Sequence, residues 1–96
     1  MRVTFNEFAK NEFNDAAQFY EQEQIALGAA FIAEVERCVQ ALLEFPRSSP
    51  VVLGSVRRRL CSRFPYGLLY TVVESEIRIL AVMNLKRRPG YWVGRS

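Results

Sequence analysis

The sequence predicts an α+β domain of order β-α-α-β-β-β, with a helical hairpin packed on one face of a small, mostly antiparallel sheet. Apolar residues recur at helical spacing through the first half of the chain. Strand-like runs separated by turn residues fill most of the second half. Half of the 96 residues are hydrophobic, which is enough for one core, so we expect residues 1–96 to form a single domain.

The chain begins with a predicted strand and a predicted helix. Residues 1–5 (MRVTF) alternate between apolar and polar side chains, as a short strand does. Asn6 is a suitable N-cap for the segment that follows. From Phe8 to about Glu21, apolar residues recur at positions 9, 13, 16, 17 and 20, and acids occupy the other face. This pattern predicts an amphipathic helix.

A second helix is predicted from Leu27 to Pro46, after a short polar connection at residues 21–24. Its apolar stripe consists of positions 27, 31, 35, 38, 39 and 42. The proline ring ends it, because it cannot continue the hydrogen-bond ladder. Two amphipathic helices with so short a link should form an antiparallel hairpin.

The second half of the chain predicts a loop, three strands and a basic tail. Residues 46–55 hold two prolines, a glycine and three serines and predict a loop. The predicted strands are residues 56–64, 66–73 and 77–83, with a tight turn at 74–76. The last two runs are apolar on both faces, so we expect them to be central in the sheet and covered on each side.

Composition excludes several kinds of active site. The chain has no histidine, which rules out a Ser-His-Asp triad, a Cys-His pair and a histidine-bearing zinc site. Cys38 and Cys61 lie 23 positions apart without a CxxC spacing, so we interpret them as two buried thiols in a reducing compartment. We expect no cofactor and no metal.

The sequence also predicts a cytoplasmic protein without a membrane partner. Its longest nearly apolar stretch, Ile25 to Ala33, has nine residues, whereas a bilayer span needs roughly 20. Residues 1–10 carry charges among their apolar positions and do not resemble a signal peptide.

Charge is divided unevenly between the two halves. Residues 1–50 carry a net charge of −4 and residues 51–96 carry +7. An asymmetry of this size predicts an anionic partner for the second half.

Strand periodicity places Arg57, Arg59, Cys61 and Arg63 on one face, and Val56, Arg58, Leu60, Ser62 and Phe64 on the other. Three arginines on one face of a strand are costly unless that face is wet or meets an anion. Salt bridges to the acids of the helices would explain the pattern equally well, and the segment alone leaves both interpretations open.

The tail favours a binding function. Four cations surround two aromatic residues there, namely Lys86, Arg87, Arg88 and Arg95 around Tyr91 and Trp92. Guanidinium groups bind phosphate and aromatic rings stack on unpaired bases, so the pattern is typical of a single-stranded RNA site. For Trp92 alone, a role in closing the edge of the core is the favoured interpretation.

These motifs together resemble the RelE/ParE toxins of type II toxin–antitoxin systems, also grouped as plasmid stabilisation proteins. Residues 57–70 (RRRLCSRFPYGLLY) are similar to the family's RR…L..FPY.I.Y signature, and residues 77–82 (IRILAV) to its last strand. Residues 88–95 (RPGYWVGR) resemble its R.P.YW..R ending, and the stretches 16–20 and 31–36 resemble its helices. Many members carry histidine before the basic tail, where this chain has Asn84.

The resemblance implies a growth-inhibiting toxin with either of two activities, so whether the chain is an enzyme stays open. RelE-like members are ribosome-dependent, metal-independent mRNA endonucleases. Cations would then stabilise the charged transition state, and Tyr91 or an arginine would handle the proton. Since tyrosine has a pKa of about 10, cationic surroundings would have to lower it. The implied catalytic residues are Arg57, Arg63, Lys86, Arg87, Arg88 and Tyr91.

ParE-like members poison DNA gyrase without being nucleases, and the R.P.YW..R ending is closer to theirs. This makes gyrase poisoning our first expectation, with Arg58, Arg59, Tyr91, Trp92 and Arg95 as target-binding residues. A non-toxic, partner-binding relative is a further alternative. Under either activity the family implies a small acidic antitoxin that forms a hetero-oligomer with the toxin, with an amphipathic helix in an apolar groove beside the helices.

Overall fold

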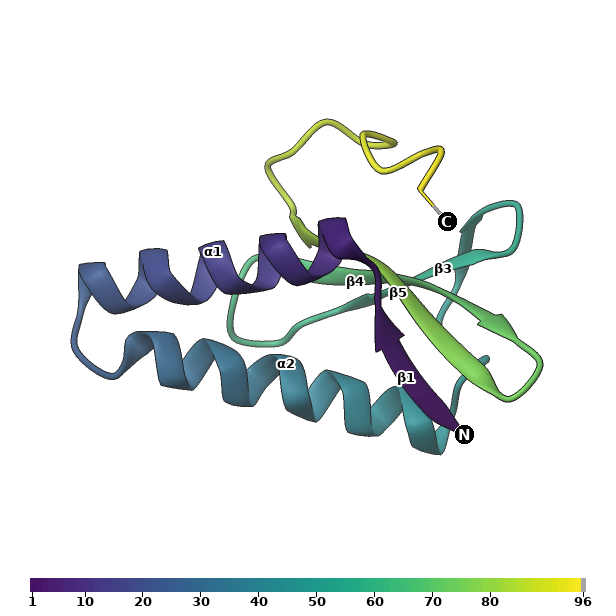
Figure 1. Ribbon diagram of the computed structural model, residues 1–96, viewed down its shortest axis with the longest axis horizontal. Coiled ribbons are helices and arrows are strands. Elements are labelled where there is room, and N and C mark those ends of the chain that lie inside the picture. Colours follow the sequence, from purple (N-terminus) through teal and green to yellow (C-terminus); the bar gives the residue numbers. More distant parts are fainter. Residues whose placement is uncertain (96) are drawn as a thin grey trace.

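The computed structural model describes residues 1–95 and has the predicted order of elements with one short strand added. Figure 1 shows two helices beside one sheet. The elements are β1 Arg2–Phe5, α1 Glu7–Glu23, α2 Leu27–Glu44, β2 Val51–Leu53, β3 Val56–Leu60, β4 Tyr66–Val73 and β5 Glu76–Asn84.

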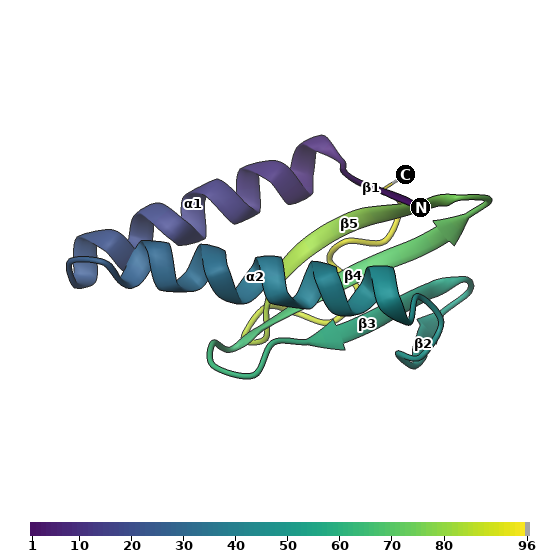
Figure 2. The ribbon, with the colours of Figure 1, turned by 90° about the horizontal axis from the view of Figure 1, so that it is seen from below.

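The five strands form one open sheet in the order β1-β5-β4-β3-β2. β1 pairs with β5 in parallel, and every other pair is antiparallel. Figure 2 shows α1 and α2 running side by side along the sheet. The predicted α+β class and helical hairpin are confirmed.

Local chemistry explains how the helices begin. The Asn6 side chain accepts a hydrogen bond from the backbone N–H of Ala9 at 2.8 Å, as an N-cap does. At the start of α2, the Glu21 carboxylate accepts from the N–H groups of Ala26 and Gly28, each at 3.0 Å. Gly28 also lets the helices approach closely, because a Cβ there would lie 2.6 Å from the carbonyl oxygen of Ala17.

Both faces of the central strands are buried, as their sequences predict. The main core lies between the helices and the sheet and includes Phe31, Leu42 and Tyr70, each 0% exposed. A smaller cluster forms separately from it and contains the tail residue Trp92, which packs with Leu69, Ala81 and Met83. Pairing with β5 shifts by one residue between Leu69 and Tyr70, which leaves Leu80 as a bulge in β5.

Two predictions about the arginine-rich segment are wrong in part. The expected loop 46–55 contains β2, a three-residue edge strand that pairs with β3. The predicted strand 56–64 ends at Leu60, because the chain then turns toward β4. Phe64 therefore packs in the main core with the helices, and does not share a face with Arg58.

None of the helices among residues 1–95 is long and apolar enough to cross a membrane.

Candidate functional site

The C-terminal tail, residues 85–95, folds back onto the domain and carries most of the predicted site. Figure 1 shows it on the side of α1 away from α2. Successive turns shape it, with Tyr91 N–H donating to the carbonyl of Arg88 at 3.3 Å and Arg95 N–H to that of Trp92 at 3.1 Å. Trp92 is 6% exposed, so it anchors the tail in the second cluster, in agreement with its expected core role.

One carboxylate, that of Glu12 on α1, holds the tail in place. Its Oε2 accepts a hydrogen bond from the Tyr91 hydroxyl at 2.7 Å. The Arg95 guanidinium forms two further bonds, to Oε1 at 3.0 Å and to Oε2 at 3.2 Å. This bidentate pair is mostly shielded from water, with side chains 18% and 13% exposed for Glu12 and Arg95.

Glu12 and Arg95 also form hydrogen bonds with main-chain groups on the open edge of β5. The pairing of β1 with β5 ends at Phe5 and Ile79, so the main chain beyond Ile79 has no strand on that side. Glu12 Oε1 accepts from the N–H of Val82 at 3.0 Å, and Arg95 donates to the carbonyl of Leu80 at 3.2 Å. The tail is thereby tied to both α1 and the sheet.

Tyr91 lies in contact with two guanidinium groups but is not activated by them. The carbon atoms at the centres of the Arg87 and Arg95 guanidinium groups lie 4.0 Å and 4.9 Å from its ring centroid. Burial, the hydrogen bond to Glu12 and the charge of that carboxylate raise the pKa of Tyr91, against a smaller lowering by the arginines. Its phenol is therefore protonated at neutral pH, contrary to what proton abstraction requires.

A shallow groove of about 350 Å³ separates α1 from the tail, and it offers little acid–base chemistry. Asn84, which stands where the resemblance implied a histidine, is used in a turn. Its Oδ1 accepts from the N–H of Lys86 at 2.9 Å, and its amide donates weakly to the Tyr66 hydroxyl at 3.4 Å.

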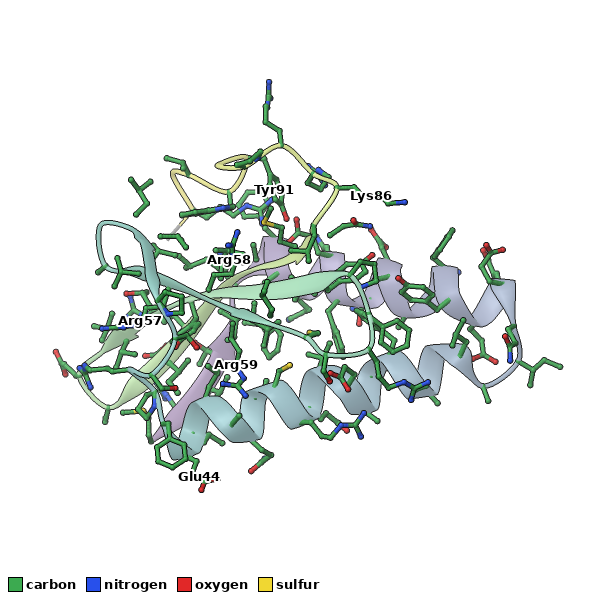
Figure 3. The ribbon with its side chains drawn as sticks, turned by 180° about the vertical axis from the view of Figure 1, so that it is seen from behind. Glu44, Arg57, Arg58, Arg59, Lys86 and Tyr91 are labelled. Carbon is green, nitrogen blue, oxygen red and sulfur yellow. The ribbon has the colours of Figure 1, made fainter. Side chains whose placement is uncertain are left out.

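The exposed cations of the tail are Lys86, Arg87 and Arg88. None of them forms an ion pair within residues 1–95. Figure 3 shows Lys86 at the outer edge of the tail, directed away from the fold. Three of the four cations of the predicted cluster therefore face solvent, whereas the fourth, Arg95, is paired with Glu12.

The arginines of β3 are divided between the two faces of the sheet. Arg57 donates to the main-chain carbonyls of Arg47 and Ser49 at 3.0 and 2.7 Å, so it holds the segment after α2. Arg58 lines a hollow with tail residues including Trp92. Figure 3 shows Arg59 directed toward α2 and Arg58 toward the tail.

Arg63 lies beyond the end of β3 and stacks over the Phe64 ring at 5.6 Å. The expected catalytic set is therefore spread over three places, with Arg57 on the helix side, Arg63 in the loop before β4 and the other members in the tail. The pairing of arginines with helix acids, the other interpretation of this segment, is not seen within residues 1–95 for Arg57, Arg58, Arg59 or Arg63.

Comparison with known proteins identifies the family. Residues 3–89 match the sequence model of a protein family that is described as the ParE toxin of type II toxin-antitoxin system, parDE. The chain belongs to this family. No curated protein matches it in sequence. The solved structures that match include the chromosomal ParDE TA system from P. aeruginosa, with a TM-score of 0.65 and 16% identity over 90% of this chain and 97% of that one. This likeness shows a shared fold.

In this member of the ParE family, sequence reasoning missed the role of Glu12 and assigned it to the outer face of the first helix. A signal existed in the spacing, because Glu12 is three residues after Ala9 and four before Ala16, both of which are buried. An acid so placed lies at the border of the packed face. Its partners, however, are 70 or more residues away in the chain and no local pattern indicates them.

Two apolar surfaces of this ParE-family chain are open to solvent. A groove of about 600 Å³ lies between α1, α2 and β1 and is lined by Phe5, Phe13, Ala33, Val35 and Val39, among others. At the opposite edge of the sheet, strand β2 exposes three aliphatic side chains. Val51, Val52 and Leu53 are 50%, 39% and 52% exposed.

Proposed function

We propose that this ParE-family chain is a growth-inhibiting toxin that acts by binding DNA gyrase, and that an acidic antitoxin neutralises it. The observation that carries the choice of a binding mechanism is the hydrogen bond from the Tyr91 hydroxyl to Glu12. It occupies the hydroxyl of Tyr91, the tail side chain that, apart from the arginines, the nuclease alternative assigns to proton transfer.

Three further features support binding over RNA cleavage. The chain lacks histidine, and Asn84 in its place cannot transfer a proton. Arg57 is occupied by two main-chain carbonyls, on the other side of the sheet from the tail cluster. What the tail offers to a partner is therefore arginine side chains and part of the Tyr91 ring, and arginine and tyrosine are enriched at protein interfaces.

We propose a set of target-binding residues that differs from the one expected from the sequence. Trp92 is buried and Arg95 is paired, so we assign to both the task of shaping the tail. Arg59 is directed toward α2. The side chains left to contact a target are Arg58, Lys86, Arg87 and Arg88, with the edge of the Tyr91 ring.

The first experiment compares gyrase and translation as targets of the purified protein. Replacing Lys86, Arg87 and Arg88 together with alanine should weaken inhibition of gyrase supercoiling roughly 10- to 100-fold, at about 0.5–1 kcal/mol for each exposed cation. Lys10→Ala is the matched control, because it removes an exposed cation from α1 and should change nothing. Circular dichroism establishes that each variant is folded.

Other outcomes assign the chain differently. Growth arrest with unaltered supercoiling, together with new mRNA ends that need ribosomes, would make it a RelE-like nuclease. A chain that binds an antitoxin but stops neither gyrase nor translation would be a non-toxic relative.

The antitoxin proposal rests on the apolar groove beside the helices and on the surplus positive charge. The groove suits an amphipathic helix, which places its apolar face on Phe13, Val35 and Val39. Ala33→Glu introduces a buried charge in this contact and should weaken binding of the antitoxin, which we expect to be encoded next to this gene, at least tenfold. Gln18→Glu, on the exposed face of α1, is its control. Equal affinity of both variants would place the helix elsewhere.

A further inference from the structure

A pair of thiols joins α2 to the sheet away from the tail. Cys38 lies on α2 and Cys61 directly follows β3, and their sulfur atoms are 3.4 Å apart. Cys38 is 6% exposed and Cys61 is half-buried, and both are free thiols. Two thiols in van der Waals contact are already close to the separation at which a covalent bond forms.

A cation without a counter-charge lies beside this pair. Arg59 lies on β3 two residues before Cys61, and Figure 3 shows its side chain directed toward α2. Its Nε is buried and has no hydrogen-bond partner among residues 1–95. A buried N–H without a partner is costly, and a thiolate is the anion that this site can supply to the guanidinium.

The neighbouring acid does not serve as that anion. The Glu34 carboxylate accepts hydrogen bonds from Arg37 at 2.7 Å and from the N–H and hydroxyl of Ser62 at 2.8 and 2.7 Å. The charged groups that face the thiols are thus Glu34, which disfavours a thiolate, and Arg59, which favours it. The hydrogen bond between the two thiols is the largest cause that lowers the pKa of Cys38, and it raises that of Cys61.

We propose that Cys38 and Cys61 form an oxidisable dithiol, which closes into an intrachain disulfide on reaction with hydrogen peroxide. The Cys38 thiolate attacks one peroxide oxygen, the O–O bond breaks, and the hydroxide that leaves takes up the proton lost by Cys38. The product is a sulfenic acid. The Cys61 sulfur then attacks the Cys38 sulfur, the S–O bond breaks, and water leaves with the Cys61 proton. In total, two thiols lose two electrons and one peroxide is reduced to two waters.

A metal ion is the competing occupant of this site. One ligand atom each of Glu34, Cys38 and Cys61 lies within 4.8 Å of the others. The positive charge of Arg59 opposes a cation there, and the three hydrogen bonds to Glu34 leave its carboxylate little freedom to turn toward one. These contacts favour oxidation over metal binding.

The test uses the full chain, reduced and then treated with peroxide at neutral pH. The expected product is a monomer that has lost two hydrogen atoms, does not react with iodoacetamide and yields a peptide linking Cys38 to Cys61. Because the bond constrains the unfolded chain, the Tm should rise by roughly 5–15 °C and fall again with dithiothreitol. Cys38→Ser and Cys61→Ser should each abolish this rise.

The rate of disulfide formation in Arg59 variants provides a second measurement, which would not change if Arg59 had a purely structural role. Arg59→Met should slow disulfide formation about tenfold at neutral pH, while Arg59→Lys, which keeps the charge, should slow it less. Peroxide that yields only intermolecular dimers, or oxygen adducts on two unlinked cysteines, would overturn the proposal. So would stoichiometric binding of zinc ions that protects both thiols, since the site would then be a metal site.

Discussion

Removing the Glu12 carboxylate tests whether one side chain of α1 holds the tail. Glu12→Ala leaves the Arg95 guanidinium without its counter-ion, at a position where that side chain is only 13% exposed. It also leaves the Val82 N–H and the Tyr91 hydroxyl without the acceptor that they share. Each of these groups is at least partly shielded from water and would lose this partner.

The magnitude follows from these contacts. Breaking a buried ion pair on one side costs about 3–5 kcal/mol, and each unsatisfied donor costs about 1–3 kcal/mol. These costs do not add, because water can enter a site whose acid is 18% exposed, and alanine gains a few tenths of a kcal/mol in helix propensity. We expect the free energy of unfolding to fall by about 3 kcal/mol. In a domain of this size, that lowers Tm by roughly 12–20 °C.

Two assays separate loss of the tail contact from general instability. Urea unfolding measures the free energy, and fluorescence reports on Trp92, which is the only tryptophan and is buried. A detached tail exposes Trp92 and shifts its emission to the red before the helices unfold. Glu12→Gln, which keeps an acceptor without the charge, should cost about half as much. Asp15→Ala, an exposed acid one turn further along α1, should stay within about 0.5 kcal/mol of the wild type. An unchanged Trp92 emission and a loss below about 0.5 kcal/mol in Glu12→Ala would refute the reasoning.

Two further predictions concern the helical hairpin. The hydrogen bonds from Arg37 and then Ser62 lower the pKa of Glu34 from 4.5 to about 2, so its contribution to stability is complete above pH 4.5 and is lost as the pH falls through 2. Glu34→Gln should therefore flatten the dependence of the urea midpoint on pH between 4.5 and 2, and an unchanged slope would contradict this. Gly28→Ala places a methyl group 2.6 Å from a backbone oxygen and should lower the free energy of unfolding by about 1–3 kcal/mol, despite the better helix propensity of alanine. A stabilised Gly28→Ala protein would show that the helices separate without cost.

The sequence predicted those parts of the fold that rest on local chemistry. Asn6 caps α1 as expected, and the runs that are apolar on both sides became the central strands β4 and β5. β2 escaped prediction because three residues between Pro50 and Gly54 are too few to establish an alternation. Phe64 was assigned to the wrong face because strand periodicity was continued past Leu60, where the strand has ended.

The candidate site was predictable in composition but not in its internal bonds. Basic and aromatic residues identified the tail as a surface of interest, and the buried Trp92 confirms the interpretation given for that residue alone. The protonation state of the Tyr91 phenol depends on Glu12, which is 79 positions away in the chain. Only the fold brings the two together, so the sequence could not show that this phenol has a raised rather than a lowered pKa.

The distribution of ion pairs gives the charge asymmetry a structural meaning. Of the nine basic side chains in residues 51–96, only Arg78 and Arg95 form ion pairs within the part of the chain that the structure describes. The other seven keep their charge without an internal carboxylate, although the first half carries eight acids. Among the acids of the first half, Glu12 anchors the tail, Glu21 binds the N–H groups at the start of α2, and Glu34 binds Ser62 and Arg37. Most of the positive charge of the second half is therefore left uncompensated. That surplus is available to the proposed acidic antitoxin and to the proposed target alike, so the two are expected to compete for it.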